Sequence, residues 1–176
     1  MTKKGLIQVY TGTGKGKSTA AIGQAARAAG HDFKVGLVTF FKDPERFGYG
    51  EYKSLEKLGV KTFLFAKKHP HFYKELNLDD VRQECHSGLE FIKELFNDPS
   101  WDMLVVDEIN IAVRDGFLTE EEVLSLLEAK PEKLELVLTG RDATEKIIEK
   151  ADLVSEVREV KHPYNQGIKA RKGVEY

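Results

Sequence analysis

Short runs of apolar residues alternate along this chain with longer segments whose apolar positions recur at helical spacing. Five apolar runs predict strands buried on both faces, at residues 6–10, 35–41, 60–65, 101–106 and 134–138. The segments between them predict helices at residues 20–29, 51–58, 77–97, 119–130 and 142–150. Strands and helices in alternation predict an α/β fold of three layers, with a mostly parallel sheet covered by helices on both faces.

Local signals mark several of these boundaries. Gly30 suits the position just past a helix, and Asn77 is a typical N-cap residue. Thr119 and Glu122 have the spacing of a capping box. The breakers in residues 42–50 predict a loop, and alternation over residues 153–160 predicts a last strand at the sheet edge.

Composition and charge narrow the class of protein. The chain has 176 residues, of which 32% are charged, with a formal net charge of −2, so we expect one domain over residues 1–176 and no nucleic-acid partner. A chain with one cysteine, Cys85, can form neither an internal disulfide nor a cysteine zinc site. Cys85 lies in a stripe of apolar residues at helical spacing, which indicates a packing role rather than a nucleophile. No apolar run approaches the roughly 18 residues of a membrane span. Residues 1–4 lead into a strand rather than a signal peptide, so we expect a cytoplasmic protein.

A glycine-rich stretch at residues 11–19 joins the first strand to the first helix. Glycines let successive backbone N–H groups point into one concavity, which the helix N-terminus also faces. Lys17 is placed to reach phosphate, and Ser18 to offer a hydroxyl to magnesium. The predicted nucleotide-binding residues are Gly12, Thr13, Gly14, Lys15, Gly16, Lys17, Ser18 and Thr19. This pattern favours a P-loop NTPase-like fold. Thr11 occupies the usual first glycine position, and a Gly/Lys-rich surface turn is the alternative.

Two further strand ends carry candidate chemistry. Asp107 and Glu108 follow an apolar run, as in a Walker B strand, where a carboxylate holds magnesium opposite Ser18. Arg141 follows the strand at 134–138 and is a candidate contact for phosphate or ribose. The alternatives are two solvated acids after a core strand and a surface arginine beside the next helix.

Residues 66–76 concentrate aromatic and cationic side chains in a predicted loop. The loop follows the carboxyl end of a strand, where open α/β sheets bind ligands. An ordinary surface loop whose rings pack on the body is the alternative. His69 and His71 have a spacing seen in metal sites, but no third ligand lies nearby in the sequence, so we do not predict a metal site at this pair.

Residues 160–176 form a basic C-terminal segment. Four formal positive charges and no acid lie between Lys161 and Lys172. The segment is either a flexible tail or a cover that folds back over an anionic ligand. No Asn-Lys-x-Asp motif indicates a GTPase, and no basic lid indicates a kinase. A P-loop ATPase or small-molecule kinase that cleaves at phosphorus stays an alternative, as does a non-catalytic nucleotide-dependent binding module.

Taken together, residues 11–21, 106–108, 138–141 and 160–176 resemble the ATP:corrinoid adenosyltransferases of the P-loop type, nearly from end to end. The resemblance implies that cobalt(I) of a reduced corrinoid attacks the 5′ carbon of ATP and that tripolyphosphate leaves, in cobalamin biosynthesis or salvage. The family binds the triphosphate reversed relative to other P-loop enzymes. A loop that begins at Thr11 is the form found in this family.

The resemblance also implies roles for individual residues. Lys17 and Glu108 would be catalytic, Ser18 and Glu108 would bind Mg²⁺ or Mn²⁺, and Arg141 would contact the nucleotide. Members exclude the lower axial ligand of the corrinoid with bulky aromatics, and the matching positions here are His71, Phe72 and Tyr73. The expected partners are ATP, a corrinoid, an electron donor such as a flavoprotein, and a second subunit in a homodimer.

Overall fold

Six parallel strands in one sheet form the centre of the molecule. The computed structural model describes residues 4–175. The expectation that residues 1–4 do not belong to a signal peptide falls largely on residues 1–3, which lie outside the described part, as does Tyr176, the last residue of the predicted basic segment. The strands are β1 (Ile7–Thr11), β2 (Val35–Phe40), β3 (Lys61–Phe65), β4 (Met103–Asp107), β5 (Glu135–Thr139) and β6 (Leu153–Glu156). Their order across the sheet is β3-β2-β4-β5-β1-β6, and every pair is parallel.

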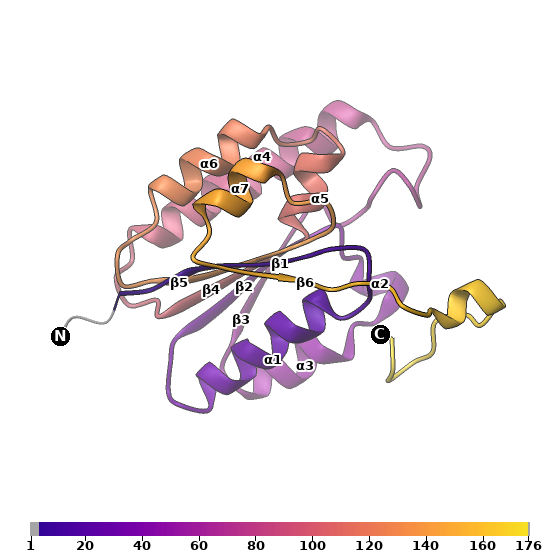
Figure 1. Cartoon of the computed structure of the whole chain (residues 1–176), viewed down its shortest axis with the longest axis horizontal. Helices are drawn as coiled ribbons and strands as arrows, with labels where there is room; N and C mark the ends of the chain where they lie inside the picture. The colour runs from indigo at the N-terminus through magenta and orange to yellow at the C-terminus, as the bar shows by residue number, and fades with distance from the viewer. Residues whose placement is uncertain (1–3, 176) are drawn as a thin grey trace.

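Helices cover both faces of this sheet. They are α1 (Lys17–Ala29), α2 (Pro44–Phe47), α3 (Gly50–Lys57), α4 (Leu78–Phe96), α5 (Ile109–Arg114), α6 (Glu120–Glu128) and α7 (Glu145–Lys150). Figure 1 shows α1 and α3 on one face, and α4, α5, α6 and α7 on the other. The predicted three-layer α/β fold of P-loop NTPase type is therefore confirmed. Among the described residues, none of these helices has both the length and the apolar character to cross a membrane.

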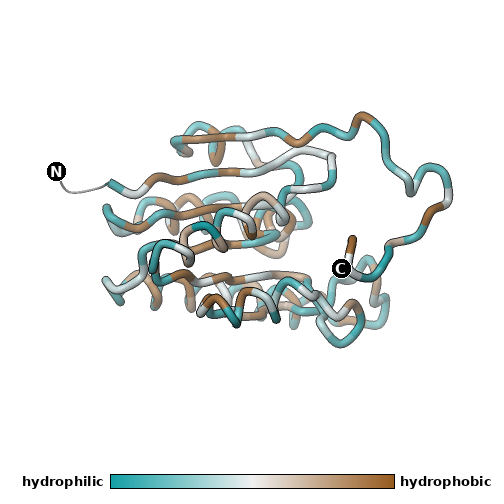
Figure 2. The backbone as a smooth tube through the Cα atoms, turned by 90° about the horizontal axis from the view of Figure 1, so that it is seen from below, coloured by the Kyte–Doolittle hydropathy of each residue, from teal (hydrophilic) through white to brown (hydrophobic). Residues whose placement is uncertain are grey.

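The core lies in two layers because the strands are apolar on both faces. Along β4, Leu104 and Val106 join the cluster under α4 to α7, whereas Met103 and Val105 join the cluster under α1 and α3. Figure 2 shows these hydrophobic stretches along the strands, with hydrophilic residues concentrated on the loops and outer helix surfaces. Such two-sided burial is expected of parallel strands between helices.

The local helix signals in the sequence are confirmed. The Asn77 side chain accepts a hydrogen bond from the Asp79 backbone N–H at 2.8 Å, which caps α4. The Thr119 hydroxyl accepts from the Glu122 N–H at 3.1 Å, and the Glu122 carboxylate accepts from the Thr119 N–H at 2.7 Å. This reciprocal capping box begins α6.

Three elements differ from the sequence prediction. Residues 42–50 contain the short helix α2, which Asp43 caps, and residues 109–114 form α5, which the prediction did not include. The last strand covers only residues 153–156 of the predicted 153–160. Its ladder stops where its partner β1 bends into the glycine-rich loop, and Thr11 with Glu156 is the last pair. The predicted edge position of this strand is confirmed.

Close packing between α4 and the sheet makes Gly88 sensitive to substitution. A Cβ at Gly88 would lie 2.6 Å from a ring carbon of Phe40 and 2.9 Å from one of Phe65. We expect Gly88→Ala to lower the free energy of unfolding by about 1–3 kcal/mol, measured by urea denaturation, although alanine favours helix formation. Gly23→Ala in α1 is the matched control, since a Cβ there meets nothing within 4 Å, and it should stabilise the protein by up to ~1 kcal/mol. Equal stability of the two variants would contradict this packing.

Candidate active site

The carboxyl ends of four parallel strands carry polar residues at one edge of the sheet. The glycine-rich loop follows β1, Lys42 follows β2 closely, Glu108 follows β4, and Arg141 follows β5. Figure 1 shows these strand ends facing the same side of the molecule. The fold therefore brings together the predicted nucleotide residues at 12–19, 108 and 141, at the edge where open α/β sheets bind ligands.

The loop after β1 has the shape that its glycines allow. Gly12 and Gly16 have φ angles of 95° and 123°, which favour glycine, and Gly16 is the N-cap of α1. Lys17 is 8% exposed, and its ammonium donates to the carbonyl oxygens of Gly12 at 2.8 Å and Gly14 at 2.7 Å. The lysine thus lies across its own loop, with Ser18 and Thr19 following in the first turn of the helix.

Thr11, which replaces the usual first glycine of a phosphate-binding loop, has a structural role. Its hydroxyl accepts a hydrogen bond from the backbone N–H of Ala143 at 3.1 Å. This bond joins the end of β1 to the segment between β5 and α7. A glycine could not make it, so the threonine fixes the loop relative to the strand end that carries Arg141.

The other side of the loop packs against the C-terminal segment. The Gly14 N–H donates to the Val157 carbonyl at 2.7 Å, and the Thr13 hydroxyl accepts from the Glu159 N–H at 3.4 Å. Lys15 forms an ion pair with Glu175 at 3.0 Å. Figures 1 and 2 show the segment leaving the body beyond β6 and turning back at the C-terminus. Val157 and Glu159 precede the basic segment at 160–176, which contains a short 3₁₀ helix at Pro163–Gln166 and contacts the loop through Glu175. Whether the segment covers an anionic ligand stays a prediction.

Two adjacent acids end β4 and are held by a threonine of β5. The Thr139 hydroxyl donates to the Asp107 carboxylate at 2.6 Å and accepts from the Glu108 backbone N–H at 3.0 Å. Asp107 and Thr139 are buried, with exposed fractions of 3% and 0%. Glu108 has a φ of 64°, which is uncommon for a residue other than glycine. The turn at Glu108 directs its carboxylate away from the strand, and Thr139 fixes that turn.

Lys42 pairs with both acids, a contact that the sequence analysis did not predict. Its ammonium lies 3.7 Å from the Asp107 carboxylate and 3.4 Å from the Glu108 carboxylate. One feature of the sequence pointed to Lys42, namely its position directly after the apolar run at residues 35–41. The contact depends on β2 lying beside β4, with Thr39 opposite Asp107, and sequence spacing does not determine that order.

Burial and neighbouring charges shift the pKa values of these groups. Burial lowers the pKa of Lys17, Glu108 opposes this shift, and Arg141 adds to it. Burial raises the pKa of Glu108, while the Lys42 charge opposes the rise. Burial also disfavours the charged form of Lys42, but Asp107 and Glu108 outweigh it and raise the pKa of this lysine. Lys42 is therefore cationic at neutral pH.

The oxygen atoms near the loop fit a hard divalent cation. Ser18 offers a hydroxyl, and Asp107 and Glu108 offer carboxylates, which are ligands suited to Mg²⁺ and Mn²⁺. Within residues 4–175, no group of three His, Cys, Asp or Glu side chains is placed to hold a metal by itself. The residues therefore fit an ion that arrives with nucleotide phosphates, which supply its other ligands.

A cavity of about 550 Å³ opens beside the two acids. Its lining is aromatic and mainly cationic, and comprises Phe41, Lys42, Phe47, Tyr49, His69, His71, Phe72, Glu108, Ile111, Arg114 and Arg141. The corrinoid candidates His71 and Phe72 thus share a cavity with the nucleotide candidates Glu108 and Arg141. Tyr73, the third corrinoid candidate, does not line it, since its hydroxyl donates to the Asp43 carboxylate.

His69 packs beneath this cavity with both ring nitrogens engaged. Its Nδ1 accepts from the His71 backbone N–H at 3.0 Å, so Nε2 carries the proton and donates to Asp115 at 2.8 Å. The ring also lies edge-on to Phe41, with 4.7 Å between centroids. These contacts leave no ring nitrogen of His69 free for a metal. They therefore argue against a metal site formed by His69 and His71.

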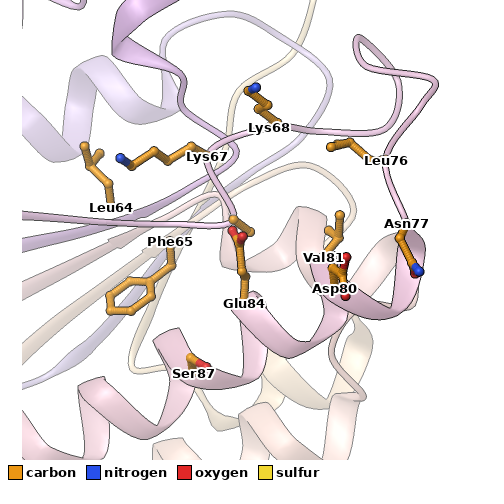
Figure 3. Close-up of a pocket in the computed structure, with 11 residues that line it drawn as sticks. Leu64, Phe65, Lys67, Lys68, Leu76, Asn77, Asp80, Val81, Glu84 and Ser87 are labelled. Carbon is orange, nitrogen blue, oxygen red and sulfur yellow. The ribbon is translucent and has the colours of Figure 1, made fainter.

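A second cavity, of about 580 Å³, lies between the end of β3 and α4. Figure 3 shows Lys67 and Lys68 entering from the loop after β3, and Asp80 and Glu84 from α4. Neither the glycine-rich loop nor the acids of β4 reach it. The loop at 66–76 therefore separates two cavities, and only the one beside Glu108 adjoins the nucleotide residues.

The three-layer fold has a parallel sheet, a glycine-rich loop with a buried lysine after β1, and two acids at the end of β4, with β5 between these strands. These features define a P-loop nucleotide-binding protein. Comparison with known proteins gives the family. Residues 3–176 match the model of the family ATP:corrinoid adenosyltransferase BtuR/CobO/CobP. The chain belongs to this family.

Proteins named as corrinoid adenosyltransferases are similar over nearly the whole chain. Corrinoid adenosyltransferase CobA of Salmonella typhimurium is 39% identical over 174 residues, which cover 99% of this chain and 87% of that protein. The corrinoid adenosyltransferase of Sinorhizobium sp is 41% identical over 177 residues, covering 99% and 81%. That of Pseudomonas aeruginosa is 36% identical over 174 residues, covering 99% and 85%.

Proposed function

We propose that this protein binds ATP on the loop at residues 11–19 and a reduced corrinoid in the cavity beside Glu108. Its reaction is that of its family, the transfer of the adenosyl group of ATP to a corrinoid. One observation carries the placement of the two substrates. The aromatic and cationic cavity shares Glu108 and Arg141 with the nucleotide side of the sheet edge, so ligands in the two places would touch.

The chemistry that we propose is a displacement at carbon. Cobalt(I) supplies an electron pair to C5′ of ATP, a cobalt–carbon bond forms, and the C5′–O bond breaks. The leaving oxygen keeps its electron pair, and tripolyphosphate departs. Because the attack falls on carbon, no base has to activate water. The protein has to stabilise the charge that develops on the leaving triphosphate.

The residues of the loop suit that task. Backbone N–H groups at the start of α1 and the ammonium of Lys17 offer positive charge within one concavity. Arg141 adds a second cation at the cavity wall. A divalent ion held by Ser18 and Glu108 would supply Lewis-acid stabilisation of the phosphate oxygens.

An ATP analogue separates this reaction from cleavage at phosphorus. In β,γ-imido-ATP a nitrogen replaces the oxygen between the last two phosphorus atoms, so ATPases and kinases do not use it. The C5′–O bond is intact, and we expect the protein to form an adenosylated corrinoid from the analogue. Absence of that product, together with release of ADP from ATP itself, would favour the alternative of a P-loop ATPase or kinase.

The corrinoid site is tested by Phe72. Its side chain lines the cavity, lies 6.3 Å from the Phe47 ring between centroids, and is 56% exposed, so its removal should not unfold the protein. We expect Phe72→Ala to raise KM for the corrinoid about tenfold, with little change in KM for ATP, because an aromatic contact is lost.

The matched control for this variant is Leu78→Ala. Leu78 is 58% exposed and lines neither cavity. Steady-state kinetics with each substrate varied in turn gives both KM values. Equal corrinoid KM values for the two variants would place the corrinoid elsewhere.

We also propose a second subunit and an electron donor as partners. Exposed apolar side chains on β6 and in the C-terminal segment, such as Val154, Val160 and Tyr164, support a homodimer, which sedimentation velocity would test. Reduction to cobalt(I) needs an electron donor, and a flavoprotein is our proposal from the family resemblance. A cytoplasmic location stays a prediction from the sequence.

A further inference from the structure

Two strained residues bring Lys42 to the acids of β4. Phe41, at the end of β2, has a φ of 58°, and Glu108, at the end of β4, has a φ of 64°. Left-handed backbone is unfavourable for a bulky aromatic residue and persists where the surrounding structure enforces it. The Phe41 backbone N–H donates to the Ala66 carbonyl at 3.0 Å, which holds this turn. Both strand ends thus bend so that Lys42 and Glu108 meet.

The hydrogen bonds that hold Asp107 and Glu108 leave carboxylate oxygens of both residues available to Lys42. Thr139 already occupies one oxygen of Asp107 and the backbone N–H of Glu108. In the described part of the chain, Lys42 is the only basic side chain in an ion pair with either carboxylate. Its ammonium therefore contacts carboxylate oxygens that a divalent ion at these two acids would need.

Lys42 also faces the cavity. It lines the wall that Glu108 and Arg141 share, and its ammonium lies 5.6 Å from the centre of the Tyr49 ring. A lysine head on a four-carbon chain can change partner without backbone movement.

We propose that Lys42 is a mobile phosphate-binding residue, which neutralises Asp107 and Glu108 in the free protein and transfers to the triphosphate when the metal–nucleotide complex binds. A divalent ion at the two acids repels an ammonium 3.4–3.7 Å from the same carboxylates and displaces it. The triphosphate would arrive with the ion and would offer the displaced ammonium a new anionic partner. This inference rests on the proposed nucleotide site.

The test separates the two roles of Lys42 by measuring two affinities in its absence. Lys42→Met removes a competitor of the metal, so Mn²⁺ alone should bind about fivefold more tightly, measured by electron paramagnetic resonance of free Mn²⁺. The same variant lacks a phosphate contact, so ATP in the presence of saturating Mn²⁺, which holds the lysine of the wild type off the acids, should bind about fivefold more weakly, measured by calorimetry. A purely structural role would move both affinities the same way.

Two further variants control the comparison. Lys42→Arg keeps the charge and should keep both affinities near those of the wild type. Lys93→Met removes a lysine that pairs with Glu90 at 2.8 Å on the surface of α4, away from the site, and should change neither. Lys42→Gln, which keeps a polar end group, replaces the methionine variant if thermal denaturation shows that it does not fold.

The outcomes are distinct for the two proposals. Wild-type protein that fails to bind Mg-ATP overturns the nucleotide site and this inference with it. If the wild type binds Mg-ATP, opposite shifts of the two affinities in Lys42→Met support the mobile lysine. The mobile lysine is overturned if both affinities shift in the same direction, or if either of them stays within about twofold of the wild-type value. That result leaves the proposed nucleotide site unaffected.

Discussion

Lys17→Ala is expected to reduce the rate of adenosyl transfer by about 10²–10³-fold or more, because one preorganised cation at the developing charge is lost. Lys17 is the buried cation of the loop, held by the carbonyls of Gly12 and Gly14 at 2.8 and 2.7 Å. In that position its ammonium lies inside the concavity that the glycines form. Single-turnover kinetics with saturating ATP and reduced corrinoid measures the chemical step and excludes slow product release.

Lys15→Ala is the matched control for this variant. Lys15 belongs to the same loop, but its side chain is 47% exposed and pairs with Glu175 in the C-terminal segment. Its loss should change the rate by only a few-fold, as for an exposed ion pair. If Lys17→Ala kept a rate near that of Lys15→Ala, the loop would not stabilise the leaving triphosphate.

Glu108→Gln is expected to have the second large effect. The substitution keeps the size of the side chain and removes the negative charge that we propose binds the metal ion. We expect the Mg²⁺ concentration for half-maximal rate to rise at least about tenfold, and the rate at saturating Mg²⁺ to fall about tenfold to a hundredfold. Glu84→Gln, an exposed acid of α4 at the other cavity, should change neither quantity.

The stability of Glu108→Gln should change much less than its activity. Burial raises the pKa of Glu108 in the folded protein, so its ionised form is less favourable there than in the unfolded chain. That cost is present above the folded-state pKa and disappears as the pH falls below the unfolded-state value. A neutral glutamine removes that cost but also removes one of the two acids that pair with Lys42, so the two effects oppose each other and we expect an unfolding temperature near that of the wild type at pH 7. A less stable and inactive variant would instead indicate a structural role for Glu108.

The sequence predicted most of the fold because its signals are local. The apolar runs, the Asn77 cap and the capping box at Thr119 each act over a few residues, and the structure contains the strands and helices that they indicate. The short helices α2 and α5 were missed because four and six residues show no clear period. The end of β6 was overestimated because alternation continues after its partner β1 has turned away.

The sequence predicted those parts of the site that come directly after a strand. The loop at 11–19 and the acids at 107–108 have fixed positions relative to an apolar run. The pairing of Lys42 with these acids depends on strand order, and the position of Tyr73 depends on its bond to Asp43, a residue in a segment expected to be only a loop. Contacts between distant segments of this kind leave no periodic pattern in a single sequence.

The reaction at carbon is tested most directly by identifying both products of one anaerobic reaction. Protein, Mg-ATP and chemically reduced hydroxocobalamin are mixed, the absorbance change of the corrinoid is followed, and the phosphate product is identified by phosphorus NMR. We predict adenosylcobalamin and tripolyphosphate in equal amounts. ADP and phosphate formed at a rate independent of the corrinoid would contradict the proposed chemistry.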